Sequence, residues 1–301
     1  MAKESLESPI YISDLLHRFI FENTPIRGNL VNIGRTYTGA LQHQDLPAVL
    51  RAAIGELMAA SALLAATIKM KGAMILQIQT TGPLKLLVVE CSDDLQMRST
   101  AKWSGDLSGL DFIDLVREGQ FVITLDPRTG SQAYQGIVPL EGNTIGELLE
   151  NYMQRSEQIQ TRIWLASDQN SAGGMLLQKL PDQPEQDLDA WDRIIYLADT
   201  ITQKELLNLP AETLLMRLFN EESVRLFEAQ PIKFHCSCSR VSVMAMLRML
   251  GEEEVQSIIE EQGNVQVHCD FCNAEYHFDR IDTEQLFSAE VMPPPVSLAR
   301  H

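Results

Sequence analysis

Four cysteines near the C-terminus constrain this chain more than any other feature of its sequence. They form two close pairs, Cys236 with Cys238 and Cys269 with Cys272. Two such pairs, separated by a short stretch of chain, are typical of a four-thiolate metal site. Zinc accepts four thiolates in a closed tetrahedron and imposes no geometry of its own. The sequence therefore predicts one zinc ion held by these four residues.

The spacing within each pair also bears on what happens without the metal. Residues two apart in an extended backbone point to the same side, so the sulfurs of the CxC pair can face one ion. CxxC is also the spacing of dithiol redox sites. Structural zinc contributes about 10–16 kcal/mol to the folding of a small site, whereas a disulfide within either pair would close almost no loop and stabilise little. Two interpretations remain: a permanently reduced structural site, which spacing alone favours, or a site whose oxidation unfolds its domain.

The charge of the chain bears on its partners. The 301 residues include 24 basic and 41 acidic side chains, for a net charge of −17. Most of the acidic excess lies after Pro181, in the part that holds the cysteines. A zinc module that binds a phosphate backbone needs clustered Lys and Arg instead. We therefore expect no nucleic-acid partner.

The sequence also indicates where the protein is located and whether it enters a membrane. The first residues, MAKESLESPIY, lack the basic head and apolar core of a signal peptide. The most apolar stretch, 58–68, is shorter than a membrane span. Cysteines at metal spacing suit a reducing cytosol. We expect a cytoplasmic protein with no membrane partner, in which the fifth cysteine, Cys91, is a buried small hydrophobe.

Before Pro181 the sequence predicts an α+β domain, residues 1–181. A long helix is expected to start with a cap at Asp45 and with Pro47 in its first turn, and to stop at Gly72. A second helix is expected to begin at Thr144, where Glu147 completes a capping box. The domain has no Gly-rich phosphate loop, GxSxG elbow or HExxH pair, so we expect no enzyme activity. Strand-like runs occur at 25–37, 74–79, 84–91, 96–103, 120–125, 133–140, 160–166 and 174–180.

The rest of the chain is predicted to form a linker and a small zinc domain. Residues 182–231 carry short, acidic, amphipathic helices interrupted by Pro210, which are individually marginal and able to dock or detach. Residues 232–290 hold the cysteines, with helical patterns between the pairs and strand-like arms around CDFC. His235, His268 and His277 lie beside the site, but four cysteines already fill a tetrahedron. Residues 291–301 are expected to be a flexible tail.

Along its whole length the sequence resembles one family, the redox-regulated holdase chaperones of bacteria, heat shock proteins of about thirty-three kilodaltons. The resemblance is carried by HRFIFENTPIRGNLVNIG, GELMAASALLAATIKMKG, GPLKLLVVE, YMQRSEQIQTRIWLA and GGMLLQ, and most specifically by CSCSR and VHCDFCNAEYHFD. One departure is the apolar run VSVMAML after CSCSR.

The resemblance implies how such a protein works. Reduced Cys236, Cys238, Cys269 and Cys272 would hold zinc and keep the chaperone inactive. Oxidation would form the disulfides Cys236–Cys238 and Cys269–Cys272, release zinc and unfold the linker. The exposed apolar surface would then bind unfolding or oxidatively damaged client proteins without ATP, and the activated protein would form a homodimer.

One alternative from another class is a zinc-structured thiol oxidoreductase that uses Cys269 and Cys272. The chain lacks a thioredoxin-like βαβ pattern around CDFC, which counts against it. Turnover of insulin or glutathione would distinguish it from a chaperone.

Overall fold

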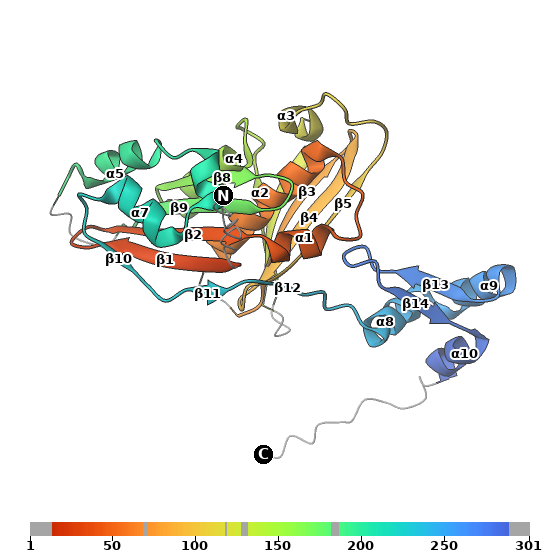
Figure 1. Ribbon diagram of the computed structural model, residues 1–301. Coiled ribbons are helices and arrows are strands. Elements are labelled where there is room, and N and C mark those ends of the chain that lie inside the picture. Colours follow the sequence, from red (N-terminus) through yellow and green to blue (C-terminus); the bar gives the residue numbers. More distant parts are fainter. Residues whose placement is uncertain (1–13, 69–70, 118, 128–131, 182–186, 289–301) are drawn as a thin grey trace, which may run out of the picture. The chain divides into compact units, whose positions relative to one another are not determined.

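The computed structural model describes residues 14–68, 71–117, 119–127, 132–181 and 187–288. Its contacts divide the chain into two units, residues 1–235 and 236–301, which are described separately. The tail expected at 291–301 and the start of the expected linker lie outside the described residues. Within them the predicted α+β class is confirmed, with sheets and helices in both units (Figure 1).

The first unit contains two six-stranded sheets. In sheet A the strand order is β10-β1-β2-β9-β8, and β11 also pairs with β1. Every neighbouring pair in sheet A is antiparallel. The strands are β1 (Leu15–Phe21), β2 (Ile26–Ile33), β8 (Thr161–Ser167), β9 (Ala172–Lys179), β10 (Val224–Leu226) and β11 (Gln230–Pro231).

Sheet B has the order β12-β5-β4-β3-β6-β7. It is antiparallel except at one edge, where β12 runs parallel to β5. The predicted hairpin around the TTGP turn is confirmed as β3 and β4. The strands are β3 (Ala73–Thr80), β4 (Leu84–Ser92), β5 (Gln96–Trp103), β6 (Gly119–Asp126), β7 (Tyr134–Val138) and β12 (Lys233–Phe234).

Helix α2 (Ala48–Ala65) lies between the sheets and contacts strands of both (Figure 1). Its buried alanines let the strands approach closely. By length and hydropathy alone it could cross a membrane, but 67% of its apolar window is buried inside the protein. The prediction that Asp45 caps this helix is wrong. The residue before the first turn is Pro47, which provides no side-chain bond, and the helix ends at Ala65, well before Gly72.

Shorter helices complete the first unit. Helices α1 (Arg35–Leu41) and α3 (Phe112–Val116) flank sheet B, and α4 (Ile145–Tyr152) continues into a π-helical turn, Met153–Glu157. The Thr144 side chain accepts from the Glu147 amide as predicted, but the Glu147 carboxylate accepts from Asn143. The predicted capping box is therefore formed only in part.

The two faces of sheet A bury different partners. Alternate residues such as Leu16, Val31 and Leu176 pack with α2 in the main core. Their neighbours face the other way and form a second core with α5 (Ala190–Ala198), α6 (Gln203–Asn208) and α7 (Ala211–Phe219). The helices of the segment predicted as a linker are therefore docked on the outer face of sheet A (Figure 1), whereas its last part, predicted as helical, forms β10 and β11 and pairs with β1.

Particular contacts hold the linker helices in place. The rings of Phe21 and Phe219 meet edge to face at 4.9 Å between centroids. The Asn32 side chain donates to the carbonyl of Leu207 over 2.8 Å. Gly173 allows close approach, because a Cβ there would lie 2.8 Å from the Leu206 carbonyl oxygen. Packing, more than helix propensity, fixes these short helices.

The second unit has a much smaller core. Helices α8 (Arg240–Leu250) and α9 (Glu252–Gln262) precede the hairpin of β13 (Val265–His268) and β14 (Glu275–Phe278), and α10 (Arg280–Ser288) follows. Helix α10 was not predicted. The apolar run VSVMAML lies on α8: Val243 and Leu247 enter the core, while Val241 is 75% exposed. The buried core residues are Val243, Leu247, Val255, Ile259, Val265, Phe278 and Leu286.

We predict that Phe219→Ala will loosen the linker helices. Phe219 is 2% exposed, and such a truncation costs about 3–5 kcal/mol. Amide hydrogen exchange in α5–α7 should accelerate, and the free energy of unfolding of the first unit should fall. The matched control is Met216→Ala on the same helix, where the side chain is 72% exposed and little change is expected. Equal exchange in the two variants would contradict this account of docking.

A second prediction concerns acid. His17 lies on the same face of β1 as Phe19 and Phe21, and its Nδ1 is buried without a hydrogen-bond partner. Burial lowers the pKa of His17, against a smaller opposing effect of Glu212 on α7. Below the unfolded pKa of about 6.5 the unfolded chain binds the proton more readily than the folded one, so stability is lost as the pH falls.

Denaturation followed by tryptophan fluorescence tests this, since Trp164 and Trp191 pack against the second core. Between about pH 7.5 and about pH 5.5 the native chain should lose more stability than His17→Gln. An identical loss in both would place the pH dependence elsewhere.

Candidate metal centre

The four predicted cysteines sit at the ends of secondary-structure elements in the second unit. Cys236 and Cys238 precede α8, whose first turn is capped by Ser239. Cys269 follows β13, and Cys272 lies in the turn that leads into β14. Two backbone bonds close this turn, from the amide of Cys269 to the carbonyl of Ala274 and from the amide of Asn273 to the carbonyl of Cys269. Each pair is thus fixed by local structure.

The fold brings all four sulfurs together. The Sγ atoms lie within 4.8 Å of one another. The Sγ atoms of Cys236 and Cys269 are 3.6 Å apart, and those of Cys238 and Cys272 are 3.4 Å apart. A tetrahedron with zinc–sulfur bonds of about 2.3 Å has edges of about 3.8 Å. The four cysteines are therefore close enough to hold a metal ion, and the donor set fits zinc.

The nearby histidines lie outside this cluster. His268 and His277 have about half of their side-chain surface exposed, and both imidazoles approach the Glu275 carboxylate. Neither belongs to the cluster of ligand atoms, which among the described residues comprises the cysteines alone. The two imidazoles are therefore placed beside the cysteine cluster and not within it.

The sequence pattern did not predict a role for Tyr276. This residue lies on β14, and its hydroxyl donates to the Cys238 sulfur over 3.1 Å. The bond to Cys238 and the neighbouring thiols raise the pKa of Tyr276 to about 12, so the hydroxyl keeps its proton and remains a donor. Hydrogen bonds of this kind orient metal ligands and tune their reactivity. The pairing of Tyr276 with Cys238 depends on tertiary structure, which spacing in sequence does not reveal.

Electrostatics favours a cation within the cluster. Burial raises the pKa of Cys272 to about 12, and hydrogen bonds with the other three cysteines contribute to the increase. Four thiolates held this closely would repel one another, and a divalent cation reverses that effect and favours their ionised form.

Arg240 ties the first cysteine pair to the hairpin. Its guanidinium donates to the carbonyl of His277, pairs with Asp282 at 2.7 Å, and stacks 4.3 Å from the centroid of Phe278. The first turn of α8, β14 and the start of α10 are thereby joined. This tie and the sulfur cluster hold the same elements together.

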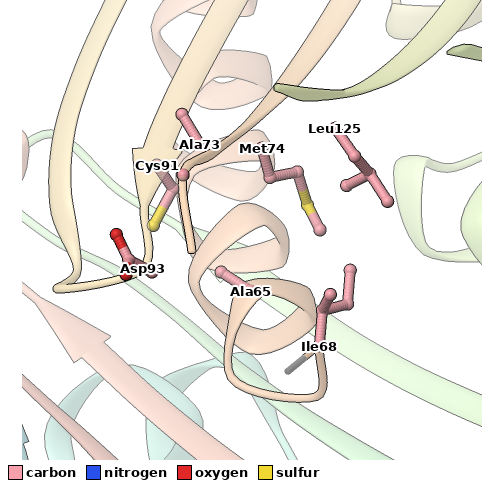
Figure 2. A pocket seen from close by; sticks show the side chains of 8 residues that line it. Ala65, Ile68, Ala73, Met74, Cys91, Asp93 and Leu125 are labelled. Atoms are coloured by element: carbon pink, nitrogen blue, oxygen red, sulfur yellow. The ribbon is translucent and has the colours of Figure 1, made fainter. Parts of the chain in front are cut away.

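Cys91 is in a different environment from the other cysteines. It is fully buried, and burial raises the pKa of its thiol to about 12. Figure 2 shows its sulfur beside a small pocket lined by residues of α2, β3, β4 and β6, with Ala65, Met74 and Leu125 among them. The expectation of a buried small hydrophobe is confirmed.

Comparison with known proteins identifies the family. A family model described as Hsp33 protein matches residues 14–279. The chain belongs to the Hsp33 family. A 33 kDa chaperonin from Methylobacillus flagellatus is 64% identical over 285 residues, covering 94% of this chain and 97% of the relative. One from Chromobacterium violaceum is 48% identical over 281 residues, covering 93% and 95%.

The fold is shared as well. The crystal structure of a 33 kDa chaperonin (heat shock protein 33 homolog) from Thermotoga maritima matches with a TM-score of 0.79. The match covers 92% of this Hsp33-family chain and 99% of that one, at 21% identity. The relatives are named as chaperones and not as enzymes, so the family resemblance is confirmed and the oxidoreductase alternative loses its support.

We predict that Tyr276→Phe will weaken metal retention. Loss of the bond to Cys238 leaves one sulfur without its donor, and such losses cost roughly tenfold in metal affinity. Chelator competition with the zinc-loaded protein measures the effect. The control is His277→Gln on the same strand, which removes an exposed imidazole that lies outside the cluster of ligand atoms. Unchanged affinity in Tyr276→Phe would show that the hydroxyl has no influence on the site.

Proposed function

We propose that this protein is a redox-regulated, ATP-independent holdase chaperone. One observation carries the proposal: four sulfurs cluster in a unit whose described residues include only seven buried apolar core residues. A core this small cannot supply much stability alone. Reduced Cys236, Cys238, Cys269 and Cys272 would hold one zinc ion and keep the unit folded. The metal would thus supply folding energy and no chemistry on a substrate.

Oxidation would remove that stabilisation. In each disulfide formed, two thiolates give up two electrons, and one hydrogen peroxide takes them up with two protons to give two waters. Two disulfides would consume two peroxides and release Zn²⁺. Neither a CxC nor a CxxC disulfide would close a loop long enough to replace the metal. Loss of zinc would therefore unfold the second unit.

The pairing Cys236–Cys238 and Cys269–Cys272 is proposed from the family resemblance. Sulfur distances of 3.6 and 3.4 Å run between the pairs, from Cys236 to Cys269 and from Cys238 to Cys272. All four sulfurs lie within 4.8 Å, so either pairing needs only small movements once the metal leaves. Peptide mapping of the oxidised protein by mass spectrometry distinguishes them.

The linker would pass this change to the client-binding surface. Helices α5–α7 cover apolar side chains of sheet A, including Phe19, Phe21 and Leu30. Their departure would expose an apolar surface of the kind that binds unfolding proteins, and hiding it at rest prevents aggregation. The net charge of −17 would keep client-loaded complexes soluble. We further propose a cytoplasmic location, formation of a homodimer on activation, and no nucleic-acid or membrane partner.

The test is a count of zinc and thiols before and after brief peroxide treatment with warming. We expect loss of one zinc and four thiols, with Cys91 unchanged, together with suppression of aggregation of an unfolding model protein. Cys91→Ser should behave like the native chain. Replacement of all four clustered cysteines by serine should abolish peroxide control. Retained zinc and intact thiols would overturn the proposal.

A further inference from the structure

The segment 230–235, called the strap below, joins the two sheets of the first unit. Its first strand, β11, pairs with β1 of sheet A, and its second, β12, pairs with β5 of sheet B. Figure 1 shows this segment crossing from one sheet to the other after β10. The strap ends at His235, and the first clustered cysteine, Cys236, is the next residue.

Backbone hydrogen bonds fasten the strap along its length. The amide of Ile232 donates to the carbonyl of Asp14 over 2.9 Å. The amides of Lys233 and His235 donate to the carbonyls of Leu95 and Met97 over 3.1 and 3.0 Å. Any extended peptide has such amides at alternate positions, so this recognition does not depend on sequence.

Side chains at alternate positions add an apolar component. Ile232 is 3% exposed and belongs to the main core. Phe234 packs on α1 opposite Gly39, where an added Cβ would lie 3.6 Å from the Phe234 ring. Lys233, between them, is exposed. The strap is therefore an apolar–polar–apolar extended segment, seated in a slot between α1 and the edge of β5.

The slot is short and well bounded. Strand β12 pairs only with Gln96 and Met97 of β5. Farther along β5 the carbonyl of Ser99 accepts from the Gln44 side chain, which covers the next part of the edge. Without the strap, the carbonyls of Leu95, just before β5, and of Met97 within it would be unpaired, beside the sites that the Ile232 and Phe234 side chains occupy. An unpaired edge of this kind recruits another strand.

We propose that this slot is a client-binding site, which the strap occupies while zinc is bound. Its ligand is an extended segment of an unfolding protein with apolar side chains at alternate positions, added parallel to β5. The strap itself is the template for this ligand. The inference rests on the proposed function, because the strap is flanked by the linker on one side and by the cluster on the other. If both the linker and the cysteine cluster lost their order, the strap would be attached to the slot only through its own contacts. A client segment could then compete with it for the slot.

The test uses the full-length chain and a fluorescent peptide with the native sequence of residues 228–235, EAQPIKFH. A second version of this peptide, used only for crosslinking, carries a photo-crosslinking residue at the Ile232 position. Protein that has lost zinc after peroxide should bind the peptide at least tenfold more tightly than the reduced protein. A control peptide with Ile232→Ser and Phe234→Ser should lose at least tenfold in affinity. An excess of a chemically unfolded protein should displace the native peptide. Crosslinks mapped by mass spectrometry should fall on α1 and on residues 95–97.

A variant provides a second measurement. Phe234→Ala should loosen the strap and raise peptide affinity of the reduced, zinc-loaded protein several-fold, whereas Lys233→Ala, at the exposed position between the seats, should not. Crosslinks on the face of sheet A that the linker helices cover, with none in the slot, would overturn the inference and leave the holdase function intact. Retained zinc and thiols after peroxide would instead refute the proposed function itself.

Discussion

The structure of the second unit depends on holding four sulfur atoms in one small volume. Its helices and its hairpin share only seven buried apolar residues, too few to offset the ordering of so many others. The cluster joins the segment before α8 to the β13–β14 turn, and Arg240 adds a second tie between the same elements. Thiolates at 3.4–3.6 Å repel one another unless a cation lies among them. If zinc binds there as proposed, folding and metal binding are one equilibrium in this unit.

The described residues of the first unit contain no such cluster. Its main core is large and includes α2, which is buried between the two sheets. Its less stable part is the layer of helices α5–α7 that covers sheet A. Helices α5–α7 contain nine, six and nine residues, lengths at which a helix is unstable in water without packing. Their stability comes from the sheet beneath them, through contacts such as that of Phe219 with Phe21. A layer of this kind can be lost while the sheet remains folded.

Sequence predicted the local features of this protein well and the long-range ones poorly. Cysteine spacing indicated the cluster because each pair is fixed within a few residues. Alternation and turn signals found β3, β4 and β5 for the same reason. The two-residue strands β11 and β12 carry no periodic pattern, and their partners lie far away in the chain. In the sequence Tyr276 is indistinguishable from any other strand residue. Its hydroxyl reaches Cys238 only because of the geometry of the folded hairpin. The Asp45 cap failed because Pro47 is the N-cap residue and the helix begins at Ala48, too far along the chain for Asp45 to cap it.

The five cysteines show that environment, more than residue type, sets thiol chemistry. Burial raises the pKa of both Cys91 and Cys272 to about 12. The two residues differ in whether a bound cation could lower that pKa again. At Cys272 the other three thiols contribute, and a divalent cation among them would convert repulsion into attraction. Cys91 lies outside the cluster and is fully buried, so its burial penalty persists in the folded state. The thiolate is the form that reacts with peroxide, and access is also required. Under the proposed mechanism an oxidant would therefore act on the clustered sulfurs and leave Cys91 reduced in an intact core.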